Sequence, residues 1–155
     1  MPTPTAYPTL TQYPTNTTVP ATATPKSGKL AWAELIDFIL NDHTNWNTYS
    51  DIYNCVNFSI DLVSGARQKG IQAWIVSVSF VGKTIGHSFV AFPTKDRGEI
   101  WIEPQSDEAY TISQVGQPLC LANNPNLCWD QGIISQIIEP AECDPVTHEC
   151  WQGNQ

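Results

Sequence analysis

Residues 87–103, HSFVAFPTKDRGEIWIE, contain two short runs of β-branched and aromatic residues joined by a polar segment with proline and glycine. The runs HSFVAF (87–92) and EIWIE (99–103) are typical of strands, and the segment PTKDRG is typical of a turn. We therefore expect an antiparallel hairpin. A turn that pairs Phe92 with Gly98 sets the register, and the register decides which side chains meet at the other end of the hairpin.

In that register His87, at the start of the first strand, lies directly opposite Glu103, at the end of the second. Directly opposed residues have β-carbons about 4.5–5.5 Å apart, so we expect the carboxylate to hydrogen-bond one imidazole nitrogen. The other nitrogen is then left to face a third group. A slip of one residue would put the two side chains on opposite faces of the sheet.

Two further strands are expected around this hairpin. Residues 72–80, QAWIVSVSF, alternate between apolar and polar side chains, which predicts a strand with one buried face. Residues 132–139, GIISQIIE, predict a fourth strand.

Two helices are expected before the strands. Residues 29–44 predict a helix with Ser27 as its N-cap. Its apolar stripe is expected to consist of Leu30, Ala33, Ile36, Ile39 and Leu40. A second helix, largely buried, is expected to start near Asn54 and to be capped at its C-terminus by Gly70. Helices packed on a mainly antiparallel sheet define an α+β class.

Cys55 stands apart from the other four cysteines and falls in the first turn of the second predicted helix. Unpaired amides and the helix dipole favour a thiolate at such a position. Nucleophilic thiol chemistry needs a thiolate, a base and a group that orients the base, and Cys55, His87 and Glu103 supply these three groups. The alternative is a buried cysteine that only packs, and the residue pattern leaves both interpretations open.

The first 28 residues differ in composition from the rest of the chain. They contain nine Thr, six of the twelve Pro and one charged residue. Such a segment buries too little apolar surface to offset its ordering entropy, so residues 1–28 are predicted to be a disordered Thr/Pro-rich stalk or linker and residues 29–155 one folded domain. We expect that an exporting or anchoring leader before Met1 has been removed, and that this missing N-terminus tethered the protein to a membrane or cell wall.

The net charge of −8 at pH 7 argues against a nucleic acid or an anionic membrane surface as partner. No stretch of the sequence approaches the roughly 18–20 apolar residues of a membrane span. The composition therefore argues against a protein that binds nucleic acid and against a membrane-spanning segment in this sequence.

Four cysteines in the last third of the chain form two local pairs, Cys120 with Cys128 and Cys143 with Cys150. In an oxidising compartment these residues are expected to form disulfides that staple the C-terminal region, and local pairing is the simplest of three possible pairings. A zinc site is the alternative, although the spacings exceed the usual two to four residues between ligands. Either arrangement leaves Cys55 unpaired.

Several motifs occur in a characteristic order between residues 30 and 110. A cysteine starts a core helix, this helix ends in Arg-x-x-Gly-Ile (Arg67–Ile71), and a histidine and an acidic residue follow on successive strands. A D-x-T motif and a tyrosine precede the cysteine, as Asp42, Thr44 and Tyr49. In these features the chain resembles the transglutaminase-like superfamily, especially its prokaryotic extracellular members.

The resemblance implies a papain-like Cys-His-acid core with Cys55 as nucleophile, His87 as base and Glu103 as orienting acid. It implies a thiol-dependent amide-bond hydrolase or acyl transferase that acts outside the cell on a protein or peptide substrate, through a thioester on the cysteine and without cofactor or metal. The alternative is a catalytically silent domain of the same kind that serves as an extracellular binding or scaffolding module.

Overall fold

The structure is a computed structural model, and it describes residues 29–138. Two α-helices and a short 3₁₀-helix precede six strands. The elements are α1 (Trp32–Asn41), η1 (Thr44–Trp46), α2 (Cys55–Gln68), β1 (Trp74–Phe80), β2 (His87–Thr94), β3 (Gly98–Glu103), β4 (Glu108–Thr111), β5 (Pro118–Leu121) and β6 (Asn124–Ile138).

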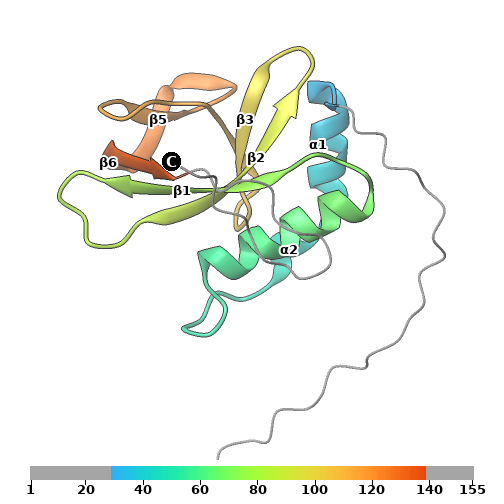
Figure 1. Cartoon of the computed structure of the whole chain (residues 1–155), viewed down its shortest axis with the longest axis horizontal. Helices are drawn as coiled ribbons and strands as arrows, with labels where there is room; N and C mark the ends of the chain where they lie inside the picture. The colour runs from blue at the N-terminus through green and yellow to red at the C-terminus, as the bar shows by residue number, and fades with distance from the viewer. Residues whose placement is uncertain (1–28, 139–155) are drawn as a thin grey trace, which may run out of the picture.

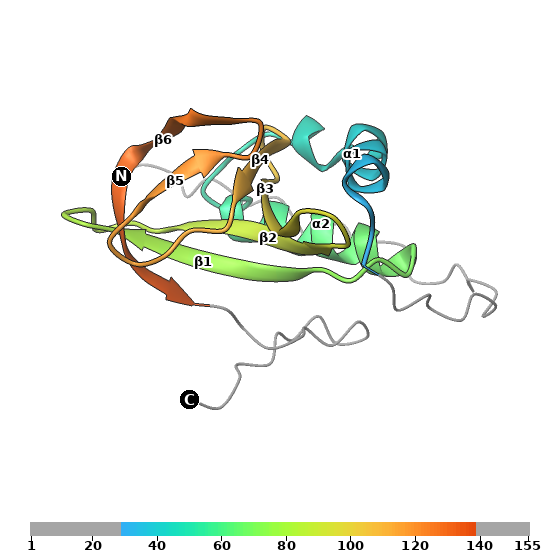
Figure 2. The same cartoon turned by 90° about the horizontal axis from the view of Figure 1, so that it is seen from above.

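The six strands form a closed antiparallel barrel in which each strand pairs with the next and β6 returns to pair with β1. In Figure 2, β6 curves away from β5 and crosses the end of β1. Gly132 of β6 has a φ of 97°, a conformation that glycine adopts without strain. Two residues further on, Ile134 pairs with Phe80 of β1.

Strands β1–β3 are covered on both faces because successive side chains point to opposite sides of a strand. One set of side chains fills the barrel interior: Val76, Val78, Phe80, Phe89, Ala91, Trp101, Tyr110, Leu119 and Ile134. The alternate set packs outside the barrel: Ile75, Val90, Phe92, Ile100 and Ile102. Together with Ala73 these side chains form a second core with the buried residues of α1 and α2: Leu35, Phe38, Ile39, Leu62, Val63 and Ala66. In Figure 1 both helices lie on this outer side of the sheet, away from β5 and β6.

The expected α+β class, with a transglutaminase-like or papain-like core of helices on an antiparallel sheet, is wrong. The described fold is mostly antiparallel β, a closed six-stranded barrel with two short α-helices outside it. The sequence patterns missed β4, β5 and the first half of β6. Two of these segments are only four residues long and the third contains Asn, Pro, Asp and Gly, so their pairing with neighbouring strands stabilises them more than their own residue pattern does.

The second helix is confirmed at both ends. Asn54 is its N-cap, and its side-chain oxygen accepts a hydrogen bond of 3.0 Å from the Val56 amide. At the other end the Gly70 and Ile71 amides donate to the carbonyls of Arg67 and Ala66, each at 2.9 Å, which is the hydrogen-bond pattern of a Schellman cap.

The predicted face of the first helix is only partly correct: Ile39 is buried and Leu30, which lies just before the helix, packs partly buried against the core, whereas Ala33 and Leu40 are exposed. The helix begins at Trp32, and it buries Leu35, Phe38 and Ile39. Leu40, which was expected in the stripe, is 73% exposed. Ser27, the expected N-cap, lies outside the described residues, and Ala31 takes that position.

Cys120 and Cys128 form a disulfide between β5 and β6, as expected from their spacing, and this excludes the zinc alternative for these two residues. Closing a loop of this length contributes about 2–3 kcal/mol to stability in the chain-entropy model. The predicted pair of Cys143 and Cys150 lies outside the described residues, as does the predicted stalk.

Candidate active site

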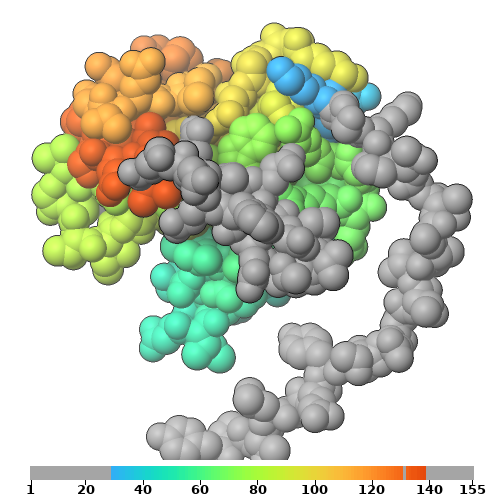
Figure 3. Space-filling model, in the orientation of Figure 1, coloured from blue at the N-terminus to red at the C-terminus, as the bar shows by residue number. Residues whose placement is uncertain are grey.

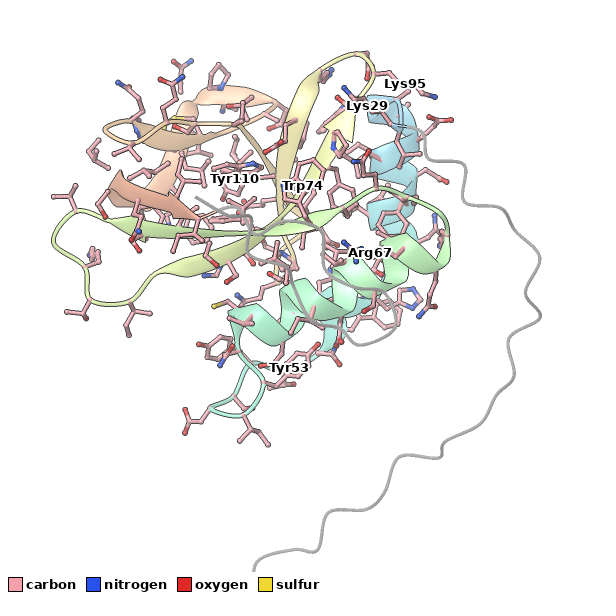
Figure 4. All side chains as sticks on the ribbon, in the orientation of Figure 1. Lys29, Tyr53, Arg67, Trp74, Lys95 and Tyr110 are labelled. Atoms are coloured by element: carbon pink, nitrogen blue, oxygen red, sulfur yellow. A yellow bond between two sulfur atoms is a disulfide. The ribbon has the colours of Figure 1, made fainter. Side chains whose placement is uncertain are left out.

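Three structural elements bring the predicted residues together at one end of the β2–β3 hairpin. Cys55 is the first residue of α2, His87 is the first residue of β2, and Glu103 is the last residue of β3. In Figure 3 the segment that leads into α2 (teal) projects from the body of the molecule on the side of the β1–β2 turn (yellow-green). Figure 4 places Tyr53 beside the start of α2.

The hairpin register differs by two residues from the expected one. Thr94, instead of Phe92, pairs with Gly98, and Val90 pairs with Ile102. The prediction that His87 and Glu103 are directly opposed is therefore wrong. The prediction that they share a face of the sheet is confirmed, because a shift of two residues leaves each side chain on the same face. They are diagonal neighbours, close enough for long side chains to meet, and His87 Nε2 hydrogen-bonds Glu103 Oε2.

Both oxygens of the Glu103 carboxylate are engaged. Oε2 contacts His87, and Oε1 accepts a hydrogen bond of 2.9 Å from the Gln105 backbone amide. The Glu103 side chain is 3% exposed, so this carboxylate is buried and fixed in orientation. A buried carboxylate with these partners favours a positive charge on the imidazole that it contacts.

Cys55 is a free, partly exposed thiol. It hydrogen-bonds His87, and this bond is the main reason that the pKa of the thiol lies below its ordinary value. Burial acts in the opposite direction, while the charge of His87 and hydrogen bonds from the backbone and side chain of Ser88 lower the pKa further. The thiolate therefore has hydrogen-bonding partners on β2 in addition to the favourable helix end.

Burial by itself lowers the pKa of His87, but the hydrogen bonds to Cys55 and Glu103 and the negative charges of these two residues outweigh it and raise the pKa to about 9. The ring also packs against Phe89 and Trp129, with centroid distances of 4.9 and 5.0 Å. The raised pKa favours an imidazolium at neutral pH. Together with the lowered thiol pKa, this favours a thiolate–imidazolium pair.

Two residues of the site were missed from the sequence. Trp129 covers the His87 ring but lies in the part of β6 that was not predicted as a strand, and its only signal was its position next to Cys128. Ser88 follows His87 directly, and its approach to Cys55 depends on how α2 packs against β2.

Asp42 of the D-x-T motif has a local structural role. Its Oδ1 accepts a hydrogen bond of 2.9 Å from the Thr44 amide at the end of α1. Within residues 29–138, no group of three or more His, Cys, Asp or Glu side chains is arranged to hold a metal ion. No helix in the described range is both long and apolar enough to cross a membrane.

No protein-family model matches the chain, and no curated protein matches it either. The geometry of the described residues is therefore the basis for a functional proposal.

The charge state of His87 can be followed directly by NMR. We expect its ring signals to titrate with a midpoint near pH 9, because a raised pKa keeps the proton on the ring until the pH rises through that value. Glu103→Gln is expected to move the midpoint to lower pH, since it removes a negative charge that favours the imidazolium. A midpoint near the ordinary value of about 6.5 in the wild type would contradict the described pairing.

Gly86 holds β2 close to β1 immediately before His87. A β-carbon added at Gly86 would lie 2.6 Å from the Val78 carbonyl oxygen, so the backbone has to shift. We expect Gly86→Ala to displace His87 and to slow alkylation of Cys55 about 10-fold, because a smaller fraction of the thiol is then ionised. Gly82→Ala in the same turn is the control, because its φ of 72° makes alanine strained there although no atom lies within 4 Å. Equal alkylation rates in the two variants would show that Gly86 does not position His87.

Proposed function

We propose that the protein is a thiol-dependent amide-bond hydrolase or acyl transferase that works through a thioester on Cys55. The observation that carries the proposal is that His87 hydrogen-bonds the buried Glu103 carboxylate and is also the residue that lowers the pKa of the Cys55 thiol most. A nucleophile bound to a base, and a base bound to an orienting acid, is the arrangement that such chemistry requires.

Each residue has a defined role in the proposed reaction. The Cys55 thiolate attacks the carbonyl carbon of an amide, and the negative charge moves to the carbonyl oxygen, next to the Cys55 amide at the start of α2. The C–N bond then breaks, and His87 donates its proton to the leaving amine. Glu103 keeps the ring oriented and stabilises its charge.

The second half of the reaction releases the acyl group. His87, now neutral, removes a proton from water or from an incoming amine, which attacks the thioester carbonyl. The C–S bond breaks and returns the thiolate, while His87 carries the proton again. Water as the acceptor makes the protein a hydrolase, and an amine makes it an acyl transferase.

We place this activity outside the cell, with a protein or peptide as substrate. The Cys120–Cys128 disulfide supports an oxidising compartment. The transglutaminase-like order of cysteine, histidine and acid along the chain supports the reaction class, although the barrel differs from the core expected for that superfamily.

The test is to trap the thioester. The full chain is incubated at pH 7 with a mixture of internally quenched peptides, and the acid-quenched protein is analysed by mass spectrometry. We expect turnover and an acyl adduct on the Cys55 peptide, and loss of both in Cys55→Ser. Added methylamine should divert the acyl group to the methylamide. Turnover that persists in Cys55→Ser, or no adduct and no turnover in the wild type, would contradict the proposal and favour a silent binding domain.

A further inference from the structure

A cavity of about 280 Å³ opens at the barrel mouth next to the candidate active site. It is lined by Glu108 and Tyr110 of β4, by Trp129 and Asp130 of β6, and by the side chains of two leucines. Its volume is just below the range for ligand pockets, about 300–1,000 Å³, which suits one amino-acid side chain more than a larger molecule. In Figure 4 Tyr110 points into the space enclosed by the strands.

Trp129 connects this cavity to the proposed catalytic residues. The centroid of its ring lies 5.0 Å from that of the His87 ring and 5.5 Å from that of the Tyr110 ring. The Trp129 side chain therefore packs on the active-site histidine and also forms one wall of the cavity. In the proposed reaction His87 gives its proton to the leaving amine. A substrate whose leaving amine meets His87 brings the residue on the amine side of that bond toward the Trp129 wall of the cavity.

The lining of the cavity is chemically selective. Among the described residues that line it, Glu108 and Asp130 are carboxylates and none is cationic. The Tyr110 hydroxyl donates a hydrogen bond of 2.9 Å to Glu108 Oε2. Burial is the main cause that raises the pKa of this tyrosine, and Glu108, Glu103 and Asp130 raise it further by their negative charges. The electrostatic potential at the opening of the cavity is therefore negative, and the faces of the aromatic rings also attract cations.

A second observation concerns Trp129 Nε1. This indole N–H is a buried donor and has no hydrogen-bond partner among the described residues. A charge or a ligand placed next to this unpaired N–H changes its surroundings, so its NMR signal reports on the Trp129 wall of the cavity.

We propose that the cavity is a specificity site for a lysine or arginine residue on the amine side of the amide bond that Cys55 attacks. The cationic head lies against Glu108, Asp130 and the aromatic rings, and the alkyl stem packs on Leu121 and Leu127. The catalytic meaning of the site rests on the proposed function, whereas the binding of a cationic residue does not.

The experiment measures binding without turnover. Nα-acetyl-lysine methylamide and its neutral counterpart, Nα-acetyl-norleucine methylamide, are titrated into the ¹⁵N-labelled full chain. The readout is the Trp129 indole N–H signal, assigned by its absence in Trp129→Phe. We expect the lysine probe to bind about 10-fold more tightly than the norleucine probe, a combined ion-pair and cation–π effect, and to lose this advantage at high salt.

Matched variants identify the carboxylates. Glu108→Gln, which can still accept from Tyr110, and Asp130→Asn should each weaken lysine-probe binding about 3-fold. Asp37→Asn on α1 makes the same charge change away from the cavity and should have no effect. Equal binding of the two probes, or no change at Trp129 with either, would overturn the proposal.

Failure of the function and failure of this inference give different results. Cys55→Ser should bind the lysine probe as the wild type does, because the thiol is not part of the cavity. If the lysine probe binds selectively but no peptide is turned over, the proposed reaction is contradicted, whereas the proposed binding site for a cationic residue is supported. If peptides are cleaved with no preference for a basic residue on the amine side, the proposed specificity site is contradicted, whereas the proposed reaction is supported.

Discussion

Replacing His87 by alanine will slow the reaction of Cys55 with iodoacetamide at pH 6 by 10- to 100-fold. A thiol of ordinary pKa, about 8.5, is only about 0.3% ionised at this pH. In the wild type the hydrogen bond and the charge of His87 lower the thiol pKa, so a larger fraction is thiolate. The gain in rate is smaller than the gain in thiolate, because a thiolate of lower pKa is also a weaker nucleophile.

Controls separate activation of the thiol from simple exposure. His43→Ala removes an exposed histidine that stacks on Trp46, away from the thiol, and should leave the rate unchanged. Glu103→Gln should give an intermediate loss, since it weakens the orientation and charge of the ring without removing it. Modified residues are identified by peptide mapping. Equal rates for wild type and His87→Ala would show that the histidine does not activate Cys55, and the proposed enzyme would then be abandoned for a silent binding domain.

Replacing Trp101 by alanine will lower the free energy of unfolding by about 3–5 kcal/mol. Trp101 is fully buried in the barrel interior, where it stacks near Phe89 at a centroid distance of 6.2 Å. Its Nε1 also donates a hydrogen bond of 2.6 Å to Glu99. Since small domains have only about 5–15 kcal/mol of stability, the loss should lower the melting temperature by roughly 15 °C or more.

Trp46→Ala is the matched control for this substitution. Trp46 is 74% exposed, so its removal creates no cavity and should change stability by less than about 0.5 kcal/mol. Urea unfolding followed by circular dichroism measures both variants under the same conditions. A Trp101→Ala loss below about 1 kcal/mol would contradict a barrel that is closed around this side chain.

The order and spacing of the candidate site residues were predictable because each depends on a local signal. Cys55 falls in the first turn of a helix whose N-cap is the residue before it, and both ends of that helix follow from short-range hydrogen bonds. His87 and Glu103 share a face because strand alternation has a period of two, and the observed shift of two residues keeps that face.

Closure of the barrel was not predictable from residue patterns. It depends on pairing between β1 and the last part of β6, more than 50 residues apart in the sequence, and on two strands of four residues each. Such pairing is stabilised by contacts that no single segment contains. The α+β prediction followed from seeing four of the strands and none of the closing pairs.

Local signals in the sequence were enough to predict a cysteine at a helix start and a histidine and a glutamate on one face of a hairpin, because helix ends and strand alternation are local properties of the chain. A disulfide of Cys120 with Cys128 was only the simplest of the possible pairings, and the structure selects it. Folding of the whole domain was needed to bury Glu103 with both oxygens bound, to bring Ser88 and Trp129 to the site and to form an acidic cavity beside it. These features combine side chains of α2 and of several strands that are distant in the sequence, so their positions depend on how the whole barrel packs.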